Sequence, residues 1–170
     1  MNITVELVTI EEKEILRNLT EKYEYEFTAY EDADVNNLGL YNYKFIDHYF
    51  TEEGWFAYFI KVNNVLAGFI MVNNCHKYIQ KIESKYIVSE LFVMYKYKKL
   101  GVGTYAVNYV LNKHKGKWQI GYNPKNEIGK IFWNKVVNEY TNGEYELIKE
   151  NVDQMYEDGI MGEVLIFESK

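Results

Sequence analysis

The segment 89–104 combines the residue types best suited to chemistry in this chain. An apolar stretch ends in a turn with lysines at positions 96, 98 and 99, and Gly101-Val102-Gly103 then opens a stretch with helical periodicity. The start of a helix presents unpaired backbone N–H groups and the positive end of the helix dipole. Glycines before such a start let the backbone close on an anion, because no Cβ intervenes. The spacing therefore predicts a phosphate-binding turn.

A single carboxylate precedes this turn. Glu90 is the only charged residue in the apolar stretch 86–94. Burial raises the pKa of a carboxyl group and makes it a better proton acceptor near neutral pH. Glu90 is therefore our candidate for a general base, and the simpler alternative is that it only contacts a substrate ammonium or a neighbouring lysine.

The elements that must position these residues follow from hydrophobic periodicity and turn signals. Asn63-Asn64 is a strong two-residue hairpin signal, and Gly116 is placed as a left-handed cap after the helix that begins at residue 102. The pattern predicts strands over 3–8, 55–62, 65–72, 86–94, 117–122, 145–149 and 163–168, and helices over 11–25, 43–49, 102–115 and from 123 or 126 to 140. Residues 73–85 read as a loop. This order predicts a mixed α/β (α+β) fold.

Composition limits the classes of protein to consider. The 170 residues favour a single domain over 1–170, and one cysteine, Cys75, permits no internal disulfide or paired-cysteine metal site. The formal charge of −6 argues against nucleic acid as a partner. His48, His76 and His114 lack metal-ligand spacing. With no apolar run of membrane-spanning length and no secretory pattern at the N-terminus, we expect a cytoplasmic protein without a metal or membrane partner.

The glycines also permit two other interpretations. Gly101 to Ala106 satisfies the dinucleotide pattern G-x-G-x-x-A. That pattern belongs to the first strand–helix turn of its fold, with an acid about 20 residues later, whereas half of this chain precedes it and Tyr122 and Asn123 stand at the later position. The plainer alternative is a tight turn with no ligand, which the three adjacent lysines make less attractive.

Taken together, these residues resemble the GNAT superfamily of acyl-CoA N-acyltransferases. The family pattern V-x-P-x-x-R-x-x-G-x-G/A is matched from Val93 to Gly103, with Tyr95 in place of proline and Lys98 in place of arginine or glutamine. A second family element, N-x-x-A-x-x-F-Y, is matched by the stretch 126–133. The resemblance covers about residues 55–137. It implies a central mixed, mostly antiparallel sheet flanked by helices.

The resemblance implies acetyl-CoA as co-substrate. The backbone N–H groups from Lys99 to Thr104 would hold the pyrophosphate, with Lys98 supplying positive charge nearby. The end of the preceding strand would pair with the pantetheine arm, and a backbone N–H at Val93 or Met94 would polarise the thioester carbonyl. The cofactor-binding residues implied are Phe92, Val93, Met94, Lys98, Lys99, Leu100, Gly101, Val102, Gly103, Thr104, Asn126, Phe132 and Trp133.

The reaction implied is direct attack of a primary amine on acetyl-CoA, with Glu90 taking the proton directly or through water. The acid that usually protonates the leaving thiolate in this family is a tyrosine, and Trp133 occupies that position. An indole N–H is a very poor acid. The tyrosines at 105, 122 and 140 are alternatives, and unassisted loss of the thiolate is another.

The acceptor would be a small-molecule or peptide amine. Acids and tyrosines in the segment 26–49 could recognise a cation by charge and by cation–π contact, or could simply be an exposed loop. They are Glu26, Tyr30, Asp32, Asp34, Tyr41 and Tyr43. A homodimer is compatible with the resemblance. The alternative function is an acyl-CoA-binding module that no longer catalyses, which the tryptophan at position 133 favours.

Overall fold

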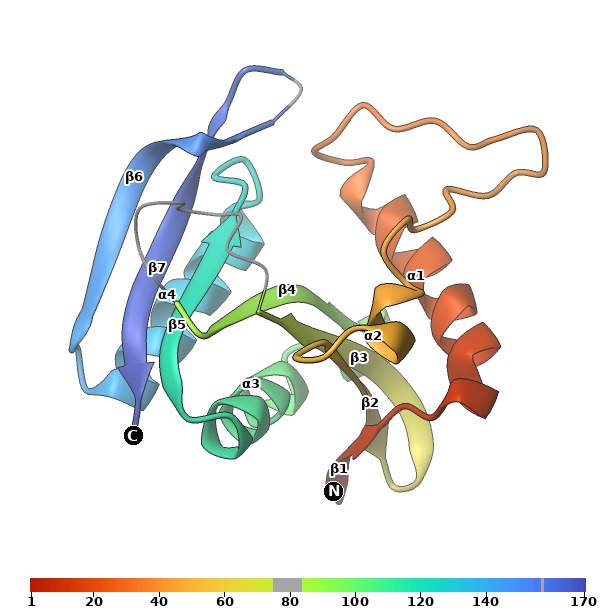
Figure 1. Ribbon diagram of the computed structural model, residues 1–170, viewed down its shortest axis with the longest axis horizontal. Coiled ribbons are helices and arrows are strands. Elements are labelled where there is room, and N and C mark those ends of the chain that lie inside the picture. Colours follow the sequence, from red (N-terminus) through yellow and green to blue (C-terminus); the bar gives the residue numbers. More distant parts are fainter. Residues whose placement is uncertain (75–83, 157) are drawn as a thin grey trace. The chain divides into compact units, whose positions relative to one another are not determined.

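The computed structural model describes residues 1–74, 84–156 and 158–170 (Figure 1). Its strands form one seven-stranded sheet in the order β1-β2-β3-β4-β5-β7-β6. Strands β4 and β5 pair in parallel, whereas the pairs β1–β2, β5–β7 and β6–β7 are antiparallel. The strands are β1 Ile3–Leu7, β2 Phe56–Val62, β3 Val65–Asn73, β4 Tyr86–Val93, β5 Gly116–Tyr122, β6 Tyr145–Met155 and β7 Met161–Ser169. The predicted mixed, mostly antiparallel sheet flanked by helices is confirmed.

The chain divides into two compact units. The first comprises Met1–Met71 with Glu90–Ala106, and the second comprises Val72–Ser89 with Val107–Lys170. The phosphate turn, Glu90 and the predicted acceptor segment all belong to the first unit. The second family element belongs to the second unit.

In the first unit, helix α1 (Lys13–Phe27) covers the sheet with one apolar face. Leu16, Leu19 and Tyr23 recur at helical spacing and join a buried cluster that includes Phe69 of β3 and Phe92 of β4. The ring of Tyr23 meets those of Phe69 and Phe92 edge-on. This packing fixes the turn of α1 that faces β4.

Three short elements complete the first unit, together with the start of helix α3 (Val102–Lys113). Helix α2 spans His48–Thr51, and the 3-10 turns η1 and η2 span Ile10–Glu12 and Tyr95–Tyr97. A long irregular segment, 28–47, returns from the end of α1 to α2 (Figure 1). This is the segment in which the sequence placed the acceptor site.

The predicted hairpin is confirmed between β2 and β3. Asn63 and Asn64 have φ angles of 50° and 65°, the left-handed conformation that a type I′ turn needs at both central positions. Asparagine tolerates this region better than other residues with a Cβ.

In the second unit, helix α4 (Glu127–Thr141) begins and ends at clear caps. The side-chain oxygen of Asn126 accepts a hydrogen bond from the Gly129 N–H at 2.8 Å, which makes Asn126 the N-cap. Asn142, at φ 54°, closes the other end. Of the two predicted starts, 126 is therefore correct and 123 is not.

Several element boundaries differ from prediction for identifiable reasons. Helix α3 (Val102–Lys113) ends before Gly116, which instead opens β5 with φ 139° rather than capping the helix. The predicted helix over 43–49 is wrong except at its last two residues, because residues 44–47 form turns and the N–H groups of His48 and Tyr49 bond to carbonyl oxygens three residues back rather than four. The helix predicted over 11–25 is a 3-10 turn followed by α1, and β6 and β7 extend beyond their predicted ends.

Part of the segment that precedes β4 is not described by the structure. The loop predicted over 73–85 lies largely outside the described residues, as do Cys75 and His76. In the described part of the chain, no helix is long and apolar enough to span a membrane.

Candidate active site

The predicted phosphate turn has the backbone shape that an anion requires. Gly101 adopts φ 80° and is followed directly by the first residue of α3, Val102. A left-handed residue beside a right-handed one turns successive N–H groups toward a common point, and the first N–H groups of a helix have no intrahelical partner. A Cβ built on Gly101 meets no atom within 4 Å, so open space lies in front of the turn.

Lys98, one of the lysines of the turn, forms an ion pair with a carboxylate. Lys98 Nζ lies 2.6 Å from Glu26 Oε2 on α1, and both side chains are about two-fifths exposed. Lys96 Nζ lies over the ring of Tyr97. The sequence placed the charge of Lys98 at the pyrophosphate, whereas the structure places it in an ion pair with α1.

The backbone at the end of β4 distinguishes between the two predicted carbonyl-binding N–H groups. The Met94 N–H donates to the carbonyl oxygen of Ala67 in β3 at 2.8 Å, so it is not free for a substrate. Successive residues of a strand direct their N–H groups to opposite edges. The Val93 N–H therefore points away from β3, and of the two predicted donors only Val93 remains.

A glycine in β3 fixes this part of β4. A Cβ built on Gly68 would lie 2.0 Å from the carbonyl oxygen of Phe92 and 3.0 Å from Val93 Cα. Only a residue without a Cβ permits this approach. Nothing in the sequence singles out Gly68, because its role depends on a neighbouring strand.

Glu90 is held by two tyrosine hydroxyls. Tyr43 donates to Glu90 Oε1 at 2.9 Å, and Tyr23 of α1 donates to Glu90 Oε2. Burial raises the pKa of Glu90 to about 7, the two tyrosine hydrogen bonds oppose that rise, and the charges of Glu24 and Glu31 add to it. With a pKa of about 7 the carboxyl changes its charge near neutral pH, and the residue keeps some contact with solvent.

The two tyrosines were not predicted as partners of Glu90. Tyr43 was proposed to contact the acceptor, and Tyr23 was treated as part of the apolar face of α1. Burial raises the pKa of Tyr43 far above its ordinary value, and the adjacent Glu90 charge adds to the rise, so its hydroxyl keeps its proton and donates it to Glu90. No spacing in the sequence links residues 23, 43 and 90.

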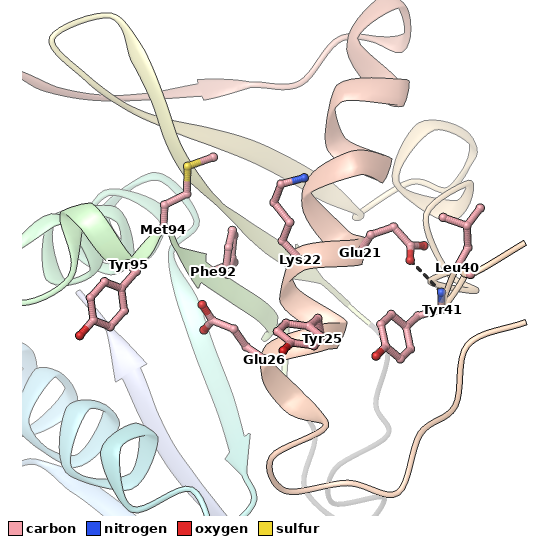
Figure 2. Close-up of a pocket in the computed structure, with 10 residues that line it drawn as sticks. Glu21, Lys22, Tyr25, Glu26, Leu40, Tyr41, Phe92, Met94 and Tyr95 are labelled. Carbon is pink, nitrogen blue, oxygen red and sulfur yellow. Dashed lines mark hydrogen bonds between the residues drawn. The ribbon is translucent and has the colours of Figure 1, made fainter.

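A cavity of about 460 Å³ opens in the first unit, between α1, the segment 28–47 and the end of β4 (Figure 2). Phe92 forms part of its wall and shares a sheet face with Glu90, because residues two apart in a strand point the same way. Two of the predicted acceptor residues, Glu26 and Tyr41, line this cavity. Tyr43 contacts Glu90 instead, and Tyr30, Asp32 and Asp34 are not part of the wall.

The family model of the acetyltransferase (GNAT) family matches residues 13–125, which include the phosphate turn, Glu90 and most of the cavity wall. The chain belongs to the GNAT family of acetyltransferases. No curated protein matches the sequence significantly.

Solved structures agree with this GNAT assignment at the level of the fold. An acetyltransferase from Thermus thermophilus has a TM-score of 0.70 at 11% identity, with 99% of this chain and 97% of that chain covered. An N-acetyltransferase from Staphylococcus aureus has a TM-score of 0.64 at 12% identity, covering 99% and 98%. A second GNAT acetyltransferase from the same organism has a TM-score of 0.62 at 13% identity, covering 99% and 100%. The interpretation of Gly101 to Ala106 as a dinucleotide-binding turn is therefore wrong, since α3 follows the fourth strand of a largely antiparallel sheet.

The remaining predicted site residues of this GNAT protein lie in the second unit. Phe132 and Trp133 are partly buried on α4, with their rings 5.0 Å apart and nearly perpendicular, and Asn126 uses its side-chain oxygen as the helix cap. Their part in binding coenzyme A stays a prediction.

Tyr122, one of the alternative acids, is bound into a polar network. Its hydroxyl donates to Glu163 at 2.8 Å and accepts from Asn134 at 2.7 Å, while Lys130 donates to the other oxygen of Glu163. Burial raises the pKa of Tyr122, and the Glu163 charge adds to the rise. Tyr122 is therefore a weaker acid than an ordinary tyrosine. Tyr140 donates to Asn112 at 3.0 Å, and Tyr105 is about half exposed.

Proposed function

We propose that this GNAT acetyltransferase transfers an acetyl group from acetyl-CoA to a primary amine, with Glu90 as the general base. The observation that carries the proposal is the carboxyl of Glu90, held by Tyr23 and Tyr43 with a pKa of about 7. An amine is largely protonated at neutral pH and must lose a proton to become a nucleophile. A carboxylate poised near neutrality suits that task.

Acetyl-CoA supplies the acetyl group when bound. In this proposal, the N–H groups of the turn that Gly101 opens bind its pyrophosphate, which fits the open space in front of that turn and the dipole of α3. The Val93 N–H binds the carbonyl oxygen that gains negative charge during transfer. The ladder between β4 and β5 covers Tyr86–Trp118 and Ile87–Gln119, and the pantetheine arm would pair with the residues of β4 that follow.

The tyrosines have a separate task from the base. By donating to both carboxylate oxygens, Tyr23 and Tyr43 fix the orientation of Glu90 and keep its pKa from rising further. A proton taken by Glu90 can leave through water because the side chain is only partly buried.

Steady-state kinetics with a panel of primary amines test the proposal. The rate is followed by the release of coenzyme A. We expect kcat/KM to rise with pH and to level off above an apparent pKa of about 7. Glu90→Gln should reduce kcat by about 100-fold or more, the range expected for loss of a general base, while the Kd for acetyl-CoA stays within about threefold. An unchanged rate in Glu90→Gln would remove Glu90 from the mechanism.

A second candidate function is an acyl-CoA-binding module without turnover. It is favoured by Trp133 at the position of the family's usual acid and by the commitment of Tyr122 to Glu163. Under this alternative, acetyl-CoA raises the melting temperature but no amine accelerates the release of coenzyme A.

A further inference from the structure

The cavity at the end of β4 is lined by three acidic or basic side chains, all on α1 (Figure 2). Glu21 accepts hydrogen bonds from the backbone N–H groups of Tyr41 and Asn42, at 2.7 and 2.9 Å. Lys22 Nζ donates to the carbonyl oxygen of Asn18 at 3.0 Å. Both side chains therefore have structural contacts: Glu21 ties the segment 28–47 to α1, and Lys22 turns back along its own helix.

Glu26 differs from these two. Its Oε2 accepts from Lys98, and among the described residues its Oε1 has no hydrogen-bond partner. The tyrosines at 25, 41 and 95 also line the cavity, and Phe92 and Met94 supply its apolar wall. A carboxylate oxygen with spare capacity beside aromatic rings and apolar surface suits an alkylammonium group.

The surroundings of the cavity are predominantly acidic. Between residues 21 and 34, six carboxylates accompany one lysine, Lys22. Glu21 and Glu31 lie near enough to raise the pKa of Glu24, whose burial is the larger cause, and Glu24 and Glu31 act in the same way on Glu90. Lys98 and Lys22 oppose this negative charge in part. A cation entering the cavity would be stabilised by it.

Glu90 and Glu26 can serve two nitrogens of one molecule. Phe92 is two residues from Glu90 on the same face of β4, about 7 Å along the strand, and it forms the inner wall of the cavity. On α1, Glu26 follows Tyr23, the partner of Glu90, by three residues, which makes the two side chains neighbours on the helix. This placement favours a ligand with two nitrogens a few carbons apart.

We infer that the acceptor is an aliphatic diamine or polyamine, whose distal ammonium is bound by Glu26 Oε1 in the cavity while its reacting amine faces Glu90. This inference rests on the proposed function for the reacting end, whereas the distal site is a binding site in its own right. Glu26 is then a specificity residue rather than a catalytic one.

Calorimetric titration without coenzyme A tests the inference through binding alone. The probes are 1,4-diaminobutane and 1-aminopentane, which have the same chain length and differ by one ammonium group. At pH 8, where Glu90 is mostly ionised, we expect the diamine to bind at least about tenfold more tightly than the monoamine, as a charge-assisted hydrogen bond would give. In Glu26→Gln, the diamine should bind no better than the monoamine, whose own affinity should not change.

Two further variants separate recognition from general charge effects. Glu14→Gln removes an exposed carboxylate from the same helix, outside the cavity, and should leave the ratio of the two affinities unchanged. Lys98→Met removes the competing cation from Glu26 and should tighten the binding of the diamine more than that of the monoamine.

The inference is wrong if wild-type protein binds the two amines equally or if the ratio survives in a folded Glu26→Gln variant. The proposed function fails in a different way. If the diamine is bound selectively through Glu26 but is never acetylated in the presence of acetyl-CoA, the distal site stands and the acetyl transfer to this acceptor does not.

Discussion

In the proposed mechanism, the surroundings of Glu90 determine how well its carboxyl accepts a proton. Its carboxyl lies on an otherwise apolar strand, where burial favours the neutral form, and two tyrosine hydroxyls restrain the shift to a pKa of about 7. Without the tyrosines the group would stay protonated at neutral pH, and in full solvent it would be too weak a base. The residue and its two donors therefore act together.

The tyrosine contacts predict a shift in the pH profile. In Tyr43→Phe, Glu90 loses a donor that stabilises its charged form, so its pKa should rise by about one unit, as expected for a hydrogen bond to a charged group. The acidic limb of kcat/KM should move to higher pH by that amount, with activity above pH 9 largely retained. Tyr140→Phe, which removes a hydroxyl that donates to Asn112 in the second unit, is the control. A limb that stays in place would show that Tyr43 does not set the pKa of Glu90.

The same group predicts a dependence of stability on pH. Because the folded-state pKa lies near 7 and the ordinary value near 4.5, the folded protein binds the Glu90 proton more tightly than the unfolded chain. This contribution to the free energy of unfolding is lost as pH rises from about 4.5 to 7. Calorimetry should therefore find a higher melting temperature for Glu90→Gln than for wild type at pH 8, where each kcal/mol of unfolding free energy corresponds to about 2–4 °C. The difference in melting temperature should be smaller at pH 5. An equal difference at both values contradicts the assignment.

At the scale of elements, the loop between β4 and α3 joins two anion-binding features. Gly101 supplies the left-handed residue that aims the N–H groups, and α3 supplies its positive end. Neither requires a particular side chain. Under the proposed function, this explains how lysine and tyrosine can stand in place of the arginine and proline that the family pattern favours at positions 98 and 95.

Substitutions at Gly103 test the turn. Gly103→Glu places a carboxylate in the first turn of α3, where the helix dipole stabilises it but where it competes with the pyrophosphate. We expect the affinity for acetyl-CoA to fall by about 100-fold or more. The melting temperature of the variant should be unchanged or raised. Gly103→Ala should keep most of the affinity. Tight binding by a folded Gly103→Glu variant would refute the assignment of the phosphate site.

Gly68 links β3 to the geometry of β4. Gly68→Ala would force its Cβ against the Phe92 carbonyl, only 2.0 Å away, and backbone cannot yield as a flexible side chain can. We expect a loss of about 1–3 kcal/mol in the free energy of unfolding, or more, and a weaker binding of acetyl-CoA through the displaced Val93. Chemical denaturation of Gly68→Ala is compared with that of Gly159→Ala. At Gly159 an added Cβ meets open space but the backbone has φ 80°, so this variant measures backbone strain without atomic overlap. Equal losses in the two variants would contradict the overlap.

At the scale of the whole molecule, the sequence contains most of the fold and part of the site. Periodicity located every strand and the main helices, and the Asn63-Asn64 hairpin was identified from its turn chemistry alone. The turn before α3 and the position of Glu90 were equally local signals. Such features are encoded by neighbouring residues, so they can be read without knowing the fold.

The parts that escaped prediction depend on contacts distant in sequence. Tyr23 and Tyr43 meet Glu90 from positions 67 and 47 residues away, Lys98 pairs with Glu26 across 72 residues, and Ala67 takes the Met94 N–H. The wrong helix over 43–49 has a local origin, since residues 44–47 form turns whose hydrogen bonds run to carbonyl oxygens three residues back. Which tyrosines among the 17 would matter was set by the packing of α1 and the segment 28–47 on β4.

The most direct test of the central claim is to detect the product. The protein would be incubated with carbon-13-labelled acetyl-CoA and a panel of primary amines that includes 1,4-diaminobutane, and the amines would then be analysed by mass spectrometry. The proposed function predicts an N-acetylated amine carrying the label with wild-type protein, and at most about one hundredth as much with Glu90→Gln. Binding of acetyl-CoA with no labelled amine from any acceptor would contradict it and would favour the non-catalytic acyl-CoA-binding module.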